Sequence, residues 1–241
     1  MVTVLRKALR RALPEAPRRA VAQVRRLVAD RLAGISPRLA RQRDPGEAFR
    51  PCVAIDQPIR QTPLWEGKLV NLRMGSALVD GVLIGPGEVF SFWALVGRPT
   101  AERGFAVGRS IRANATTGDS GGGLCQLSGI AYELGLRAGL HVVERHAHSR
   151  DLYTSEDERF TPLGLDATVV WPWKDLRLEN RLGVAVAMRF AVEGMVLKAW
   201  LECAESVPGQ DLELERIDYA DHRAVAVRRA GQTVSRDRYA I

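Results

Sequence analysis

The stretch that decides the fold class is LCQLSGIAYELGLRAGL (residues 124–140), because the chain changes character there. Its apolar residues recur at helical spacing, at Leu127, Ile130, Ala131, Leu134 and Ala138, and Gly139 is a typical helix stop. The segments that follow have strand-like composition: HVVERHAHS (141–149), DATVVW (166–171), DLRLEN (175–180), GVAVAMRF (183–190) and GMVLKAWLEC (194–203). Helices followed by a run of strands predict an α+β fold with a mostly antiparallel sheet.

Other elements can be placed around this helix. The pattern predicts a helix from about residue 64 to residue 82, a turn into a strand in VLIGPGEVFSFW (82–93), and a further strand in GRSIRANATTG (108–118). A tight hairpin is expected at AVEGM (191–195). We therefore divide the chain into a helical arm (1–44), a polar linker (45–63), a main domain (64–203), and a β-rich extension packed on that domain (204–241).

The net charge of +7 is concentrated in the arm. Residues 1–44 hold twelve Lys and Arg against three Asp and Glu, whereas the remainder is close to neutral. Within the arm, Val21, Val24, Leu27, Val28 and Leu32 lie at helical spacing between arginines. This pattern indicates an amphipathic helix that docks on its own domain or, alternatively, lies on an anionic membrane surface; nucleic acid is not the expected partner.

The N-terminal arm and the cysteines indicate the cellular compartment and the redox state of the thiols. The arm is interrupted by arginines too often to resemble a secretory signal, so we expect a cytoplasmic protein, with contact to the inner face of the membrane as an option. The three cysteines (Cys52, Cys125 and Cys203) are odd in number and have no metal-type spacing, which suggests reduced thiols. The oligomeric state has no signal in the sequence.

Two rival nucleophiles lie close together in TTGDSGGGLCQLSG (116–129). GDSGG resembles the active-serine motif of chymotrypsin-type proteases, with Ser120 as nucleophile, but no histidine precedes residue 141 to serve as its base. Cys125 instead falls in the first turn of the predicted helix, where free N–H groups and the helix dipole favour a thiolate. The amides of Gly121, Gly122 and Gly123 could receive a developing oxyanion.

A thiol enzyme also needs a base and a residue that orients it. His146 and His148 are two residues apart in a predicted strand, so they should share one face, and Asp166 opens the next predicted strand. This order, with Cys on a helix start and His and Asp on strands, is that of transglutaminase-like and papain-like enzymes. No cofactor is expected.

Two alternatives use the same residues without catalysis by the thiol. The glycine loop before the helix could simply bind an anion, although it lacks the ending of a P-loop. His146 and His148 could bind a metal together with Cys125 or Asp166, since zinc accepts such ligands.

Several motifs in the same order give a more specific signal. PGEVFSFW (86–93), GGGLCQLS (121–128), ERHAHS (144–149), GLDATV (164–169) and DLRLEN (175–180) together resemble the VanW family, whose members are associated with glycopeptide-resistance clusters and bacterial cell envelopes. Some larger members are regarded as L,D-transpeptidases that act on peptidoglycan through the cysteine of this motif.

The resemblance implies roles for particular residues. Cys125 would be the nucleophile, and an Arg-x-x-His pattern at Arg145 and His148 favours His148 over His146 as base. The family's aspartate falls on Asp166, and a further Asp and Asn fall on Asp175 and Asn180. Peptidoglycan lies outside the cell whereas no export signal is apparent, so the substrate stays open.

We therefore expect cysteine-dependent acyl transfer or amide hydrolysis on a peptide-like, cell-wall-related substrate. Cys125 would attack a carbonyl, His148 would act as base and then acid, and Asp166 would orient the imidazole. Gln126, Ser128 and His146 are further candidates for substrate contact, and the polar stretch 149–164 is a candidate lid. The alternative is a non-catalytic module that binds an anion or associates with a membrane or with nucleic acid, of which nucleic acid is the less expected partner.

Overall fold

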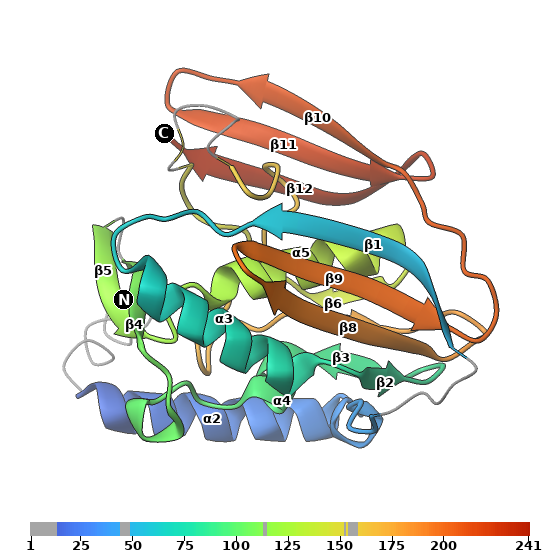
Figure 1. The fold of residues 1–241 in the computed structure, drawn as a ribbon, viewed down its shortest axis with the longest axis horizontal. Coiled ribbons are helices and arrows are strands. Elements are labelled where there is room, and N and C mark those ends of the chain that lie inside the picture. Colours follow the sequence, from blue (N-terminus) through green and yellow to red (C-terminus); the bar gives the residue numbers. More distant parts are fainter. Residues whose placement is uncertain (1–13, 44–48, 113–114, 152, 154–158) are drawn as a thin grey trace, which may run out of the picture.

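The computed structural model describes residues 14–43, 49–112, 115–151, 153 and 159–241. It shows the predicted α+β fold, in which helices and three antiparallel sheets share one main hydrophobic core (Figure 1). A two-stranded hairpin lies beside them.

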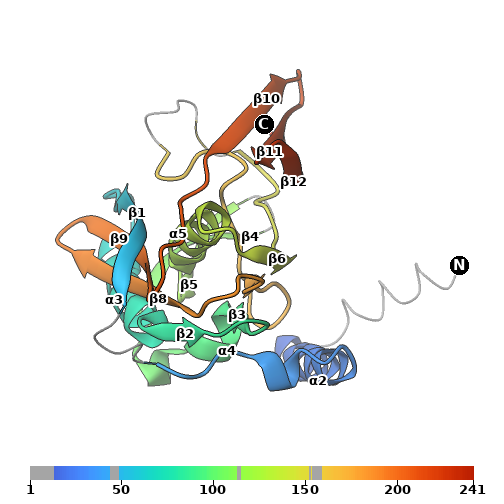
Figure 2. The same ribbon diagram turned by 90° about the vertical axis from the view of Figure 1, so that its right-hand side faces the viewer.

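The central sheet has the order β1-β9-β8-β2, formed by β1 (Arg50–Pro58), β9 (Val196–Cys203), β8 (Val186–Glu193) and β2 (Val82–Ile84). The predicted hairpin at 191–195 joins β8 to β9. Burial alternates along β9, as expected for a strand with one face on the core. Helices α3 (Trp65–Val79) and α5 (Leu124–Arg137) pack against each other and against this sheet, which holds α5 near the centre of the molecule (Figure 2).

The segment predicted as a linker is instead partly a strand, since β1 pairs with β9 along its whole length. Its polar residues suit an edge strand, and its prolines, Pro51 and Pro58, lie near its ends, where a missing N–H does little harm. The prediction of a linker over 45–63 was therefore wrong for residues 50–58.

The second sheet, of order β3-β7-β6, is made of short strands: β3 (Val89–Ser91), β7 (Arg177–Glu179) and β6 (His141–Glu144). The predicted strand 141–149 therefore ends at Glu144, and residues 166–169 form no strand at all. Short α4 (Phe92–Val96) follows β3, and two 3-10 turns cover Ser36–Arg38 and Ala101–Arg103.

The single strand predicted in 108–118 is a hairpin of β4 (Val107–Arg112) and β5 (Ala115–Ser120). The last sheet contains β10 (Leu212–Asp218), β11 (His222–Arg229) and β12 (Gln232–Ala240), in that order. It packs on the body through Leu163 and Val225, and Val225 also lies against Gly164.

Helix α2 (Glu15–Leu32) does not dock on the domain through its apolar residues, which is how an amphipathic helix usually packs on its own domain. It does dock on the domain, but through charged side chains, and the apolar stripe faces away: Val21, Val24, Leu27, Val28 and Leu32 are 49%, 59%, 59%, 53% and 83% exposed. Figures 1 and 2 show α2 at the edge of the molecule, on the side opposite the β10–β12 sheet. In the part of the chain that the structure describes, no helix has the length and apolar character needed to cross a bilayer.

Candidate active site

The start of α5 is built by close packing of glycines. A side chain at Gly122 would collide with Gly108 O on β4, which lies 2.1 Å from the position of its Cβ. Gly123, the residue before α5, has φ of +97°, a conformation that side chains disfavour, and its Cα faces the stem of Lys68. Glycine is thus required at both positions by the approach of β4 and α3.

Only some of the amides in this loop are free to bind an oxyanion. Gly121 N–H donates to Ala106 O and Gly122 N–H donates to Asp119 O, so neither serves as the sequence predicts. Gly123 and Cys125 N–H have no acceptor among the described residues. These two unpaired donors at a helix N-terminus are the ones that can face a developing negative charge.

Cys125 lies in the first turn of α5 and is partly exposed. Its Sγ is 3.8 Å from Val169 O and within hydrogen-bonding reach of the His148 imidazole. The residue is therefore only partly buried, and its thiol lies next to a base, as the sequence predicts for a nucleophile.

His148 is held from its other side by Asp166. Nδ1 of His148 is 2.5 Å from Asp166 Oδ2, which leaves Nε2 as the nitrogen that faces the thiol. The same carboxylate oxygen accepts the backbone N–H of His148 at 2.8 Å. Both residues lie on irregular segments and not on strands, so the expected order of cysteine, histidine and aspartate is present without the strands expected to carry it.

Asp166 is itself fixed by two further residues. Arg145 donates to Asp166 Oδ1 at 3.0 Å and to its backbone carbonyl at 2.7 Å, while the Tyr239 hydroxyl donates to Oδ1 at 2.6 Å. The hydroxyl also accepts Gly164 N–H. Arg145 thus acts through Asp166, as a positioning residue, and Tyr239 was not found from the sequence because nothing local distinguishes it.

The electrostatics of this line of residues favour an ion pair between thiolate and imidazolium. Burial acts to raise the pKa of Cys125, but the hydrogen bond and the charge of His148 outweigh it and lower the pKa. Burial acts to lower the pKa of His148, yet its hydrogen bonds to Asp166 and Cys125 raise the pKa to about 10. Burial is likewise overcome at Asp166, where His148 and Arg145 hold the pKa well below its usual range.

Three other candidates have partners in the fold. Gln126 is buried and its Nε2 donates to Pro58 O, while the Ser128 hydroxyl is buried and donates to Ala167 O. Ser120 ends β5 and is paired in register with Val107. Gln126 and Ser128 therefore hold backbone carbonyls of the fold, and substrate contact by either residue stays a prediction.

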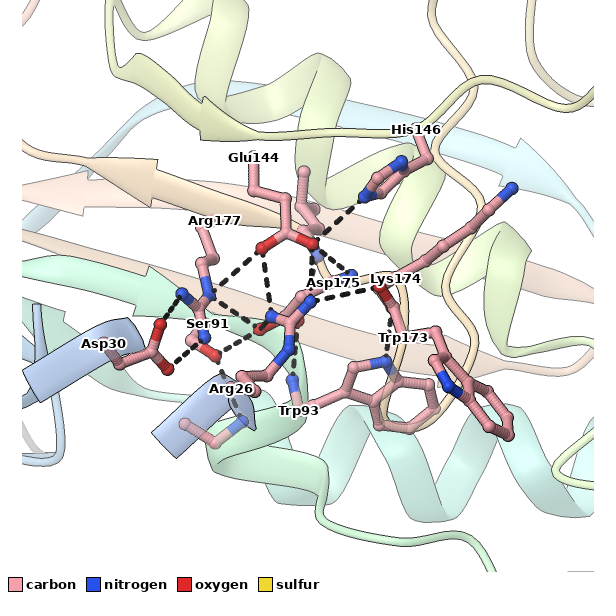
Figure 3. A network of polar contacts seen from close by, with 12 residues as sticks. Arg26, Asp30, Ser91, Trp93, Glu144, His146, Trp173, Lys174, Asp175 and Arg177 are labelled. Carbon is pink, nitrogen blue, oxygen red and sulfur yellow. Dashed lines mark hydrogen bonds and ion pairs between the residues drawn. The ribbon is translucent and has the colours of Figure 1, made fainter. Parts of the chain in front are cut away.

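His146 belongs to a different cluster from His148, although the two were expected to share a face. Its Nε2 is 3.0 Å from Glu144 Oε1, in the network that docks α2 (Figure 3). Arg26 of α2 donates to both Glu144 oxygens, and Asp30 accepts two hydrogen bonds from Arg177. Among the described residues, no group of three or more His, Cys, Asp and Glu side chains could hold a metal.

The two family positions beyond Asp166 also organise structure. Asp175 is buried in the network of Figure 3 and accepts from Ser91 Oγ, Trp93 N–H and Arg177 Nε. Asn180 is buried and donates to Ile84 O and Val184 O. Both residues fix the backbone around the second sheet.

The comparisons with known proteins decide the family. The model described as "VanW like protein" matches residues 67–201, which is more than half of the chain and includes Cys125, His148 and Asp166. The chain belongs to the VanW family. No solved structure matches it.

Two curated relatives share the VanW region. The "Vancomycin B-type resistance protein VanW" of Enterococcus faecalis is 33% identical over 115 residues, which cover 48% of this chain and 42% of that protein. The "Uncharacterized protein YoaR" of Bacillus subtilis is 31% identical over 119 residues, covering 49% of this chain and 37% of that protein. The chain thus aligns with less than half the length of either relative.

Proposed function

We propose that this VanW-family protein is a cysteine-dependent acyl transferase or amidohydrolase that acts on a peptide-like, cell-wall-related substrate. The observation that supports this most is the continuous line from Cys125 through His148 to Asp166, in which Cys125 is a partly buried residue beside an oriented imidazole. A cysteine that served only packing would not need an imidazole oriented by a carboxylate.

The chemistry that follows is nucleophilic. The Cys125 thiolate attacks the carbonyl carbon of an amide, and the amides of Gly123 and Cys125 face the oxyanion. Protonated His148 gives its proton to the leaving nitrogen as the C–N bond breaks and a thioester forms. An incoming amine or water then attacks the thioester and gives its proton to His148. The C–S bond breaks, the acyl group is released, and the pair of thiolate and protonated His148 is restored.

The substrate class is supported from two directions. An amide carbonyl suits a thiolate flanked by two free N–H donors, and one relative bears a name that refers to vancomycin resistance. We therefore take peptides of the cell wall and their precursors as the first substrates to assay. The exposed apolar residues of α2 support a membrane-associated position.

The test is the rate at which iodoacetamide alkylates each cysteine as a function of pH, followed by peptide mass spectrometry. We expect Cys125 to react faster at neutral pH than an ordinary thiol, and its rate to depend less steeply on pH, because His148 lowers the pKa of the thiol. Cys52, whose pKa burial and Cys203 raise to about 12, and Cys203, which is buried, should react slowly.

His148→Asn is the decisive variant, and His146→Asn is its matched control because His146 contacts Glu144 instead. Near pH 6.5, His148→Asn should slow alkylation of Cys125 by roughly tenfold or more, while His146→Asn should leave the rate unchanged. Equal reactivity of all three cysteines, or an equal effect of both variants, would refute the proposal and leave a non-catalytic binding module.

A further inference from the structure

Lys68 is a buried cation without an acidic partner. It lies on α3, is 6% exposed, and among the described residues its ammonium has neither a hydrogen bond nor an ion pair. Its one contact of note is with the ring of Phe160, whose centroid is 4.9 Å from Nζ. Because burying an unpaired charge is costly, its presence here points to a ligand that supplies the missing negative charge.

The surroundings of Lys68 are also positive. Its side chain passes directly over Gly123, two residues before the reactive thiol. Arg109 of β4 is close enough that its charge adds to burial in lowering the pKa of Lys68 to about 8. No ion pair of Arg109 exists within the described ranges, and the free amides of Gly123 and Cys125 complete the set.

We propose that Lys68 and Arg109 form a subsite for a carboxylate of the substrate, beside the carbonyl that Cys125 attacks. This inference rests on the proposed function and narrows it: the substrate is a peptide with a free carboxylate close to the scissile bond. Phe160, whose ring lies against the ammonium, belongs to the stretch 149–164 that the sequence marks as a candidate lid. Residues 152 and 154–158 of that stretch lie outside the described residues.

A pair of alkylating reagents that differ only in charge tests the subsite. Iodoacetate carries a carboxylate and iodoacetamide an uncharged amide, and in both cases the thiolate displaces iodide to form a thioether. The ratio of their rates at Cys125, divided by the same ratio for N-acetylcysteine, measures recognition of the carboxylate. We expect this quotient to be about ten, as one charge-assisted hydrogen bond allows.

Lys68→Met removes the ammonium while keeping an unbranched apolar chain, and it should lower the quotient several-fold, to what Arg109 alone supports. Lys198→Met is the control, because Lys198 is paired with Glu193 on the surface of β9. In the unaltered protein the quotient should also fall as pH rises through about 8, because the ammonium of Lys68, whose pKa is lowered to about 8, loses its charge there. A quotient of one in the unaltered protein, with rapid iodoacetamide alkylation, would refute the subsite and leave the cysteine chemistry standing.

A second measurement does not depend on the thiol. In Cys125→Ser protein, N-acetylalanine should perturb the NMR resonances of Gly123 more than N-acetylalaninamide does, and Lys68→Met should reduce the difference. Equal perturbation by the two compounds would refute the subsite even if Cys125 proved unreactive.

A different observation supports a second inference, about α2. Its inner side is committed to the domain through Arg26 and Asp30, so the exposed stripe defined above is left on the outside. Arg18, Arg25 and Arg31 are exposed, and none of them forms an ion pair within the part of the chain that is described. An apolar stripe between cations matches the interface of a membrane with anionic lipids.

We infer that α2 seats the protein on an anionic membrane with Val24 and Val28 in the lipid interface. Sedimentation with vesicles of phosphatidylcholine and phosphatidylglycerol should show binding that vesicles of phosphatidylcholine alone do not support. Val24→Gln with Val28→Gln should weaken binding about tenfold or more, since two valine side chains lose apolar burial. The matched change on β10, Leu214→Gln with Ile217→Gln, alters two other exposed apolar residues and should have no effect. Equal effects of the two pairs, absence of binding, or self-association through α2 would refute this inference.

Discussion

Replacing Lys68 by methionine should stabilise the protein, and the size of the gain follows from its environment. Burial and the neighbouring Arg109 lower the pKa of Lys68 from 10.5 to about 8. Below pH 8 the lysine is charged in both the folded and unfolded chain, so folding bears the full cost of burying the charge. A shift of this size corresponds to about 3 kcal/mol, which Lys68→Met should recover in part or in full at neutral pH.

The pH dependence distinguishes this cause from improved packing. Between pH 8 and pH 10.5 the unfolded chain binds more protons than the folded chain at this position, so the unaltered protein gains stability as pH rises. The difference in the free energy of unfolding between Lys68→Met and the unaltered protein should therefore shrink from about 3 kcal/mol near pH 7 to about 1 kcal/mol near pH 10.

Urea denaturation monitored by tryptophan fluorescence at several pH values measures that difference. Lys198→Met again serves as control, because its ammonium lies at the surface. If Lys68→Met destabilises the protein, or if its effect is the same at every pH, the ammonium is not an uncompensated charge. The argument for a carboxylate partner would then lose its energetic basis.

Three further predictions concern other parts of the molecule. Asp166→Asn should lower the free energy of unfolding by about 2 kcal/mol at neutral pH. Because folding depresses the pKa of Asp166, this loss should become smaller as pH falls below about 4. Urea titrations of both proteins at pH 7 and pH 3 measure the change. Asp30→Ala should free α2 from the domain and expose it to trypsin, so equal digestion of the two proteins would contradict its docking role. Two equivalents of a mild one-electron oxidant such as ferricyanide should each take one electron from the pair Cys52 and Cys203, whose sulfurs are 2.7 Å apart, so that a disulfide forms and two protons pass to solvent. An unchanged intact mass, or the same loss of two hydrogens in Cys203→Ser, would contradict this.

Local signals predicted the centre of the site well. The helix that carries Cys125 and the glycines before it could be recognised because periodicity and backbone freedom are properties of adjacent residues. The pairing of His148 with Asp166, implied by the family resemblance, has the geometry expected. The fold class could be predicted for the same reason, since the α and β segments differ in composition.

The predictions that the structure did not match concern segments whose conformation depends on residues far away in the sequence. DATVVW has the composition of a strand, yet its carbonyls at Asp166, Ala167 and Val169 accept from Arg145, Ser128 and Cys125, so its backbone is engaged by side chains and not by a sheet. Similarly, the sequence left open whether the stripe of α2 packs on the domain or faces a membrane, and the structure shows it exposed. The ion pairs of Arg26 and Asp30 join residues more than a hundred positions apart and have no local signature.

Lys68 carries a signal that is visible in the sequence but was not used. It lies four residues before Leu72, on the face of α3 that the apolar pattern marks as buried. A lone cation on such a face is rare enough that helical spacing by itself can single it out as a candidate site.

The hydroxyl of Tyr239 has a practical consequence for anyone who dissects this family. The match to the family model ends at residue 201, well before β12, so a fragment cut there keeps nucleophile, base and carboxylate but loses the phenol that helps Arg145 to anchor the last of them. Such a fragment should present an intact motif and a loosened imidazole. Homologues that lack an equivalent to β12 must brace that carboxylate with some other donor, and finding it would identify which segments the domain has exchanged during its evolution.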